Sequence, residues 1–194
     1  KLNYESRILE TSKKEQKEPW FLEINPRGQI PVIDDEETVV TESLAIMHYL
    51  EKKQPDPALF GSTPQQTGLI EQTTHEILSY TDSAITGFVN PVFRNKIEEN
   101  RDSFPAVAEK IHDELGVLDS RLAGSQWMVG NFSAADIVLI PTMQRLLRAC
   151  SKAPELAEDL TLNSLPERYP NLMRWNSATE SMDEFDTTFP PHWR

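Results

Sequence analysis

The segment from Asn25 to Ser43, with the sequence NPRGQIPVIDDEETVVTES, constrains the fold more than any other part of the chain. Ile30, Val32 and Ile33 have the composition of a short β-strand, but Pro31 interrupts them and cannot donate a ladder hydrogen bond. Either the strand lies at the edge of a sheet, or the Ile30–Pro31 bond is cis. In both cases the backbone polar groups of Ile30 face outward and can pair with another extended peptide.

The same segment ends at a predicted helix start. Thr41, Glu42 and Ser43 precede an apolar helical pattern that covers residues 43–53. Free backbone N–H groups and the positive end of the helix dipole favour a carboxylate at such a position. A small acidic peptide suits such a site as a ligand. Its backbone can pair with Ile30 as a strand would, and its carboxylate can bind at the nearby helix start.

At these residues the sequence resembles the glutathione transferase family. The pattern NPxGxIPV, followed by a hairpin and by TES before LAIMHYL, is similar to the second half of that family's thioredoxin-like glutathione-binding domain, in which the proline is cis. The resemblance implies that Ile30, beside Pro31, pairs with the cysteinyl backbone of glutathione. It also implies that Glu42 and Ser43 hold the γ-glutamyl group.

Two further residues are candidates for the glycine carboxylate of glutathione. Gln29 is one, because the family often has a Lys or Gln directly before the residue that pairs with the peptide. Lys17 is the other, by its charge, although a role on the solvated surface competes because Lys13 and Lys14 lie nearby in the sequence.

A second match lies further along the chain, where Gly130, Ser133 and Asp136 keep the family's GxxSxAD pattern. Ser133 and Asp136 have the spacing of a capping box, in which each side chain binds the backbone N–H of the other residue. Phe132 and Ile137 stand at the positions of a hydrophobic staple. In the family this segment starts a buried helix, so we expect its role to be structural.

The resemblance implies an α/β plus all-α fold. We expect a partial thioredoxin-like glutathione-binding domain at residues 1–54, a proline-rich linker at 55–63 and an all-helical domain at 64–194. The first domain is expected to begin with one more strand and helix, about 20 to 25 residues, which this chain lacks. In the family, the Ser, Tyr or Cys that acts on the glutathione sulfur lies in that segment. The catalytic residue is therefore unknown and expected upstream of Lys1, whether the segment is truncated, disordered or absent.

Apolar periodicity predicts the remaining elements. Alternation of Leu2, Tyr4 and Ile8 with polar residues predicts a half-buried opening strand. An apolar stripe over residues 69–88 predicts a long helix that kinks or ends at Asn90–Pro91. The stripe comprises Leu69, Thr73, Ile77, Tyr80, Ala84 and Phe88. A second stripe over residues 107–122, ended by Gly124, predicts an antiparallel partner helix.

Composition excludes several other classes of protein. The chain of 194 residues has 19 Lys and Arg against 31 Asp and Glu, and its net charge of −12 disfavours nucleic-acid and membrane-surface binding. A single cysteine, Cys150, excludes an intramolecular disulfide framework and a cysteine zinc site. Because no run approaches ~18 apolar residues and no signal peptide is recognisable, we expect a soluble cytoplasmic protein.

For the other reactive or aromatic residues, the sequence gives weaker support for a functional role. Tyr80, Phe88 and Phe93 lie on the helix that in the family borders the pocket for the electrophile, but core packing explains the same stripe equally well. Cys150 lies on the apolar face of a helix, which favours a buried, inert thiol. The histidines show no metal-binding spacing, and we assign no metal.

The resemblance implies a transferase in which the glutathione thiolate attacks a small hydrophobic electrophile, with glutathione as co-substrate. The alternatives are a non-catalytic binding or scaffold protein with the same fold, and a glutathione-dependent thiol reductase, dehalogenase or isomerase. A homodimer is expected from the resemblance alone. The sequence does not identify the electrophilic substrate or the class of glutathione transferase.

Overall fold

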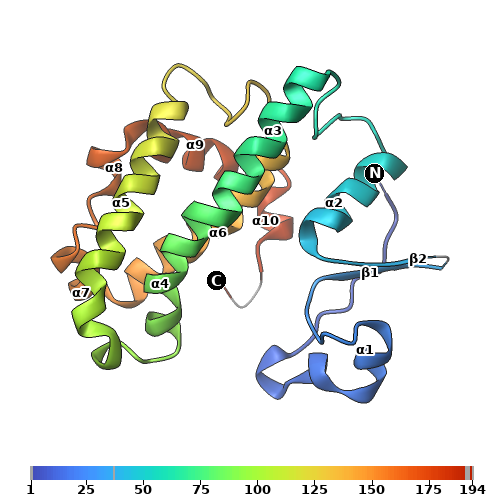
Figure 1. Cartoon of the computed structure of the whole chain (residues 1–194), viewed down its shortest axis with the longest axis horizontal. Helices are drawn as coiled ribbons and strands as arrows, with labels where there is room; N and C mark the ends of the chain where they lie inside the picture. The colour runs from blue at the N-terminus through green and yellow to red at the C-terminus, as the bar shows by residue number, and fades with distance from the viewer. Residues whose placement is uncertain (1, 37, 191–192, 194) are drawn as a thin grey trace. The chain divides into compact units, whose positions relative to one another are not determined.

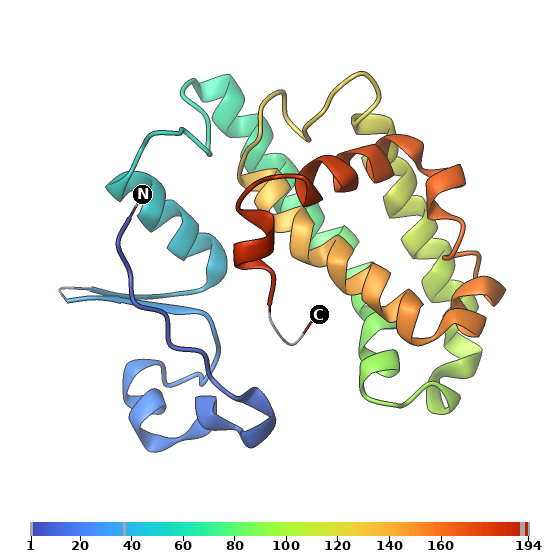
Figure 2. The same cartoon turned by 180° about the vertical axis from the view of Figure 1, so that it is seen from behind.

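The computed structural model describes residues 2–36, 38–190 and 193, and the chain divides into two compact units, Lys1–Phe60 and Gly61–Arg194. Figures 1 and 2 show that the first unit is a small α/β unit and the second consists of helices. The division after Phe60 falls within residues 55–63, the segment that we propose as the linker. No described helix combines the length and the apolarity that a membrane span requires.

The first unit is built on one antiparallel pair of strands. Its elements are the 3-10 helices η1 (Thr11–Lys13) and η2 (Glu15–Lys17), α1 (Pro19–Ile24), β1 (Val32–Asp35), β2 (Thr38–Thr41) and α2 (Ser43–Lys53). Val32 lies opposite Thr41 in the ladder, and Asp35 lies opposite Thr38. Helix α2 packs against both strands and buries Ile46.

The predicted opening strand is wrong. Residues 2–10 form no strand, and Tyr4 and Ile8 leave 84% and 77% of their surfaces exposed. Apolar alternation produces a strand only where a neighbouring strand pairs with it and buries one face, and within the described residues the sheet consists of β1 and β2 alone. The segment instead contacts α1 through Arg7, whose guanidinium carbon lies 3.9 Å from the centre of the Trp20 ring.

The second unit surrounds one hydrophobic core. Its elements are α3 (Pro64–Glu76), the π-helix η3 (Ile77–Thr81), α4 (Asp82–Phe93), the 3-10 helix η4 (Glu98–Ser103), α5 (Phe104–Arg121), α6 (Ala134–Lys152), α7 (Pro154–Asp159), α8 (Leu165–Arg168), α9 (Pro170–Glu180) and α10 (Phe185–Thr188). Helix α6 packs against α3, α4 and α9, and α5 packs against α4 and α9. Fully buried side chains such as Ile111, Met143 and Trp175 fill the space between them.

The long first helix of this unit differs from its prediction in two respects. Leu69 and Tyr80 are exposed, because the buried side of the helix runs through Ile70, Thr73 and Thr74 and then through the π-helix η3. The pattern of apolar residues alone did not identify the buried side of the helix, since two of the residues on that side are threonines. The helix also does not end at Asn90–Pro91, one of the two predicted outcomes, because α4 continues to Phe93 with Pro91 inside it. A proline this close to the end of a helix removes little of the hydrogen bonding.

The predicted capping box is present at the start of α6. Asp136 is fully buried, and its Oδ2 accepts hydrogen bonds from the backbone N–H and the hydroxyl of Ser133 at 3.0 and 3.2 Å. Its Oδ1 accepts from the backbone N–H of Met128 at 3.0 Å and from the Trp175 indole N–H at 2.8 Å. Asp136 therefore holds together α6, the loop before it and α9. Burial raises the pKa of this carboxyl, and the hydrogen bonds oppose that shift.

Candidate functional site

The turn before Ile30 is held by a buried side chain, Asn25. Its Oδ1 accepts the Arg27 backbone N–H at 3.1 Å, and its Nδ2 donates to the Gln29 carbonyl at 2.8 Å. Gly28 closes the turn with φ of +57°, and a Cβ there would lie 2.7 Å from the Gln16 carbonyl oxygen. Local hydrogen bonding thus fixes the direction in which the chain enters Ile30.

The backbone at Ile30 and Pro31 has the predicted features. The Ile30–Pro31 bond is cis, and the Ile30 side chain is 49% exposed. In the part of the chain that the structure describes, the N–H and C=O of Ile30 make no hydrogen bond, because the ladder begins at Val32. These groups are free to pair with an extended ligand.

Strand register brings this backbone beside the start of α2. Val32 lies opposite Thr41 where the ladder ends. Ile30 and Pro31 therefore directly precede one strand at this end of the hairpin, and Glu42 and Ser43 directly follow the other. Figure 1 shows α2 following directly on β2, so the segment before β1 and the start of α2 lie at the same end of the hairpin.

The start of α2 offers donors for an anion. Glu42 occupies the N-cap position of the helix, but its side chain makes no capping hydrogen bond. The first hydrogen bond of the helix runs from the Ile46 N–H to the Glu42 carbonyl at 2.9 Å. The N–H groups of Ser43, Leu44 and Ala45 consequently have no partner within the helix. Together with the helix dipole they form an anion site, and Ser43 and Glu42 are both exposed there.

Glu42 also has an unusual backbone conformation that the sequence did not reveal. Its φ of 70° and ψ of 120° are sparsely populated by residues with a side chain, at a cost of about 1–3 kcal/mol. Such strain persists where the surrounding structure imposes it, and it is found most often at ligand sites. No sequence signal identifies it, since glutamate gives no preference for positive φ.

Contacts at the far end of α2 hold the helix against the hairpin. Tyr49 and Lys53 both donate to the Asp35 carboxylate of β1, and the hydrogen bonds from Lys53 and then Tyr49 lower the pKa of Asp35. Glu51 accepts the backbone N–H groups of Leu59 and Phe60, each at 3.1 Å. The first pair of contacts holds the C-terminal end of α2 against β1, and the second holds it against the segment that follows the helix.

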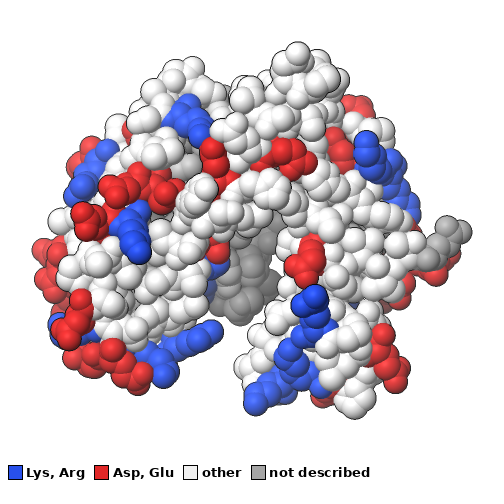
Figure 3. Space-filling model, viewed as in Figure 1, with Lys and Arg blue, Asp and Glu red and all other residues white. Residues whose placement is uncertain are grey.

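The two candidates for the glycine carboxylate lie on the same turn. The Lys17 Nζ donates to the Arg27 carbonyl at 2.9 Å, which leaves N–H donors of the ammonium available. Gln29 is exposed and directly precedes Ile30. Figure 3 shows basic side chains gathered over the segment before α1, which contains Lys13, Lys14 and Lys17. The same segment also contains Glu10, Glu15 and Glu18, and Lys13 pairs with Glu10 at 2.6 Å, so the charges of the segment balance.

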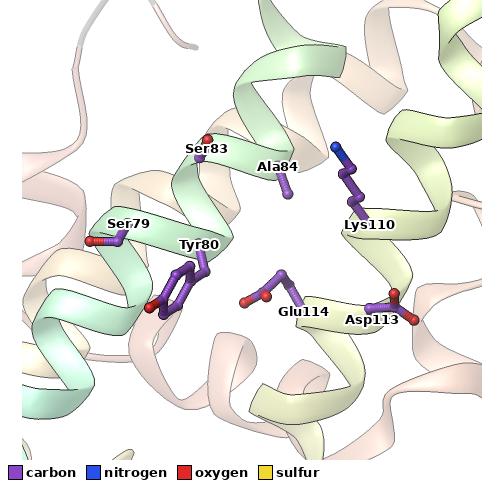
Figure 4. Close-up of a pocket in the computed structure, with 7 residues that line it drawn as sticks. All are labelled: Ser79, Tyr80, Ser83, Ala84, Lys110, Asp113 and Glu114. Atoms are coloured by element: carbon purple, nitrogen blue, oxygen red, sulfur yellow. The ribbon is translucent and has the colours of Figure 1, made fainter.

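The three aromatic candidates of the second unit do not come together. Phe88 is 0% exposed and packs edge-on against Phe104 at 6.0 Å between ring centres, so it is a core residue that offers no surface to a ligand. Phe93 is half-buried at the end of α4. Tyr80 is 61% exposed and lines a pocket of about 240 Å³ with residues of η3, α4 and α5 (Figure 4). The charged side chains of Lys110, Asp113 and Glu114 also line that pocket.

Cys150 has the environment of an unreactive thiol. Burial raises its pKa to about 11, so the sulfur is protonated at neutral pH. Among the described residues, no cluster of three or more His, Cys, Asp or Glu side chains is placed to hold a metal ion. The chemistry available to the described site is hydrogen bonding to a peptide backbone and to carboxylates.

Comparisons with known proteins identify the family. The family description "Glutathione S-transferase, N-terminal domain" matches residues 1–53, and "Glutathione S-transferase, C-terminal domain" matches residues 101–175. Glutathione S-transferase F10 of Arabidopsis thaliana is 31% identical over 189 residues, which cover 92% of this chain and 86% of that protein. Glutathione S-transferase D7 of Drosophila melanogaster is 28% identical over 177 residues, 90% of this chain and 71% of that protein.

A solved structure extends the similarity to the whole fold. The crystal structure of a glutathione S-transferase from the Antarctic clam Laternula elliptica superposes with a TM-score of 0.82 at 28% identity, covering 99% of this chain and 83% of that one. The predicted combination of a thioredoxin-like N-terminal domain with a helical C-terminal domain is thereby confirmed. The chain belongs to the glutathione S-transferase family.

Proposed function

We propose that this protein binds glutathione at the hairpin end formed by Ile30, Pro31, Glu42 and Ser43 and transfers its thiolate to a small hydrophobic electrophile. The observation that carries the proposal is the register of β1 and β2, which sets an unpaired extended backbone beside an uncapped helix start. Glutathione has the matching parts, namely peptide backbone groups and an α-carboxylate. A metal has no part in this proposal.

Each residue of the proposed site has a defined task. The Ile30 backbone pairs with the cysteinyl residue, and the Ser43 hydroxyl and the N–H groups of α2 receive the γ-glutamyl carboxylate. Glu42 accepts the γ-glutamyl ammonium. Lys17 and Gln29 take the glycine carboxylate. These contacts orient the sulfur, and we assign no residue of this chain to lowering its pKa.

Two measurements test the proposed function. We expect the protein to be retained on immobilised glutathione and eluted by free glutathione, and to conjugate glutathione to an aryl halide in solution. Failure of retention would contradict glutathione binding. Retention without any conjugation, combined with thiol-dependent disulfide reduction, would instead favour the reductase alternative, whereas retention without either reaction would favour a binding protein.

We also propose that the protein forms a homodimer through the face that α3, η3 and α5 share. Leu69, Tyr80 and Val117 are large side chains on these helices, and all are exposed. The hydrogen bond from Thr81 to Glu114 at 3.0 Å joins η3 to α5. Burying such side chains against a second copy would remove their apolar surface from water.

We expect Val117→Glu to convert the dimer to a monomer, because the substitution places a charge in the middle of an apolar interface. Light scattering coupled to size-exclusion chromatography measures the mass. Val39→Glu, which changes an exposed valine of β2 outside the proposed face, is the matched control and should leave the dimer intact. A wild-type mass equal to one chain would contradict the proposed dimer.

A further inference from the structure

Asn25 joins three neighbouring parts of the first unit through its backbone and its side chain. Its backbone N–H donates to the Phe21 carbonyl in α1, and its backbone carbonyl accepts the Gly28 N–H, both at 2.8 Å. Its side-chain Oδ1 accepts the Arg27 N–H at 3.1 Å, and its Nδ2 donates to the Gln29 carbonyl at 2.8 Å. The residue is only 3% exposed. Asn25 therefore connects α1, the turn and the peptide group that follows the turn.

The contact between Asn25 and Gln29 determines the direction of one N–H group. The Gln29 carbonyl and the Ile30 N–H belong to the same peptide group, which is planar and trans. In a trans peptide group the C=O and N–H bonds point in opposite directions. Because the Gln29 oxygen points toward the buried Asn25 amide, the Ile30 N–H points away from it.

The Ile30 N–H is available to a ligand. The ladder between the strands begins at Val32, and within the described residues the Ile30 N–H has no hydrogen-bond partner. The Ile30 side chain is 49% exposed, so a ligand can reach this residue. A donor that is held in one direction before binding costs less ordering entropy when it pairs with a carbonyl oxygen.

We infer that Asn25 is a positioning residue of the proposed glutathione site, and that it directs the Ile30 N–H toward the cysteinyl carbonyl of the ligand. This role rests on the proposed function and adds a buried residue that acts through Gln29 and Ile30. Without the bond from Nδ2, the peptide group of Gln29 and Ile30 gains rotational freedom. A ligand must then restrict that freedom when it binds, so its affinity falls.

Asn25→Asp breaks the contact on which this role depends. A carboxylate still accepts the Arg27 N–H, but it presents an acceptor where Nδ2 donates to the Gln29 carbonyl. We expect the Kd of glutathione to rise about tenfold, which corresponds to about 1.4 kcal/mol. The NMR order parameter of the Ile30 amide should fall from about 0.85, typical of a rigid backbone, to below about 0.6. An isotope-labelled protein provides both measurements.

A fragment of glutathione distinguishes positioning from a general loss of structure. γ-Glutamylethylamide has the γ-glutamyl group but no cysteinyl carbonyl, so it can bind at the start of α2 without the Ile30 N–H. We expect its Kd to be the same in Asn25→Asp as in the wild type. An equal loss of affinity for glutathione and for the fragment overturns the inference, because Asn25 would then only stabilise the first unit.

Asn100→Asp is the matched control. The Asn100 Nδ2 also donates to a backbone carbonyl, that of Lys96, at 2.8 Å. Asn100 belongs to η4 in the second unit. Its replacement should change neither the order parameter of the Ile30 amide nor the Kd of glutathione.

Failure of the inference can be distinguished from failure of the proposed function. If glutathione binds Asn25→Asp as tightly as the wild type, or if the Ile30 amide stays equally ordered, the inference is overturned. If the wild type does not bind glutathione, the proposed function is wrong. A mobile Ile30 amide in Asn25→Asp would then still support the positioning role of Asn25, toward a different extended peptide.

If Asn25→Asp does not fold, hydrogen exchange in the wild-type protein decides. The side-chain amide of Asn25 should exchange slowly with and without ligand, because it is buried and bonded to the Gln29 carbonyl. The Ile30 amide should exchange fast in the free protein and slowly with saturating glutathione. Fast exchange at Asn25, or no protection of Ile30 by glutathione, overturns the inference.

Discussion

Replacing Ser43 with alanine is expected to raise the KM for glutathione about 10- to 100-fold while kcat falls by much less. The hydroxyl stands at the uncapped start of α2, where the proposed site receives the γ-glutamyl carboxylate. A hydrogen bond to a charged group contributes about 1.5–3 kcal/mol. Because this contact is present in the ground state and the transition state alike, its loss weakens binding without slowing the chemical step. Steady-state kinetics with varied glutathione measures both constants.

A measurement of protein stability distinguishes weaker glutathione binding in this variant from misfolding. In the described part of the chain the Ser43 hydroxyl has no hydrogen-bond partner, so its removal should leave the unfolding midpoint unchanged. Ser151→Ala is the matched control, because Ser151 is exposed on α6 and bonds only to the Leu147 carbonyl at 3.1 Å. A large fall in kcat at constant KM would contradict the binding role that we propose for Ser43.

Asp136→Ala is expected to lower the free energy of unfolding by about 3–5 kcal/mol. The substitution leaves the backbone N–H groups of Met128 and Ser133 and the Trp175 indole N–H buried without an acceptor. Each such group costs about 1–3 kcal/mol, and the helix also loses its cap. Denaturation by urea, monitored by circular dichroism, measures the change.

Asp113→Ala is the control for Asp136, because Asp113 is an exposed carboxylate on α5 and its removal should change stability by less than about 0.5 kcal/mol. Asp136→Asn provides a finer comparison. An amide presents a donor where the carboxylate accepts, so we expect it to be destabilised nearly as much as the alanine variant. A stable Asp136→Asn protein would show that the shape of the side chain matters at this position and its charge does not.

Much of the site could be predicted because its signals are local. Pro31 and the Thr41–Ser43 helix start identify an irregular strand and an anion site from residues that are neighbours in the chain. The helix starts at Pro19, Pro64 and Ser133 could be predicted for the same reason. Capping residues and prolines in the first turn act on backbone groups only a few residues away. The support given by Asn25 could also have been found, because asparagine commonly bonds the backbone of its own turn.

Predictions that depended on distant partners were less accurate. The alternation at Leu2, Tyr4 and Ile8 requires a neighbouring strand, and no sequence pattern near those residues shows whether one is present. The exposure of Tyr80 and the burial of Phe88 follow from which side of one helix meets α5 and α6. The periodicity of apolar residues predicts that one side of this helix is buried. It does not show which of two neighbouring sides that is when the buried side contains threonines.

The sequence by itself determined the family resemblance, the helical second domain and the residues that meet at the hairpin end, because each depends on backbone chemistry within one segment. Only the tertiary structure decided the register that brings the segment before Val32 beside the start of α2, the strained backbone of Glu42 and the contacts by which Asp136 joins α6 to α9. The physical reason is that these features join residues far apart in the chain, or are imposed on a residue by its neighbours in space. Such contacts have no local propensity from which they could be predicted.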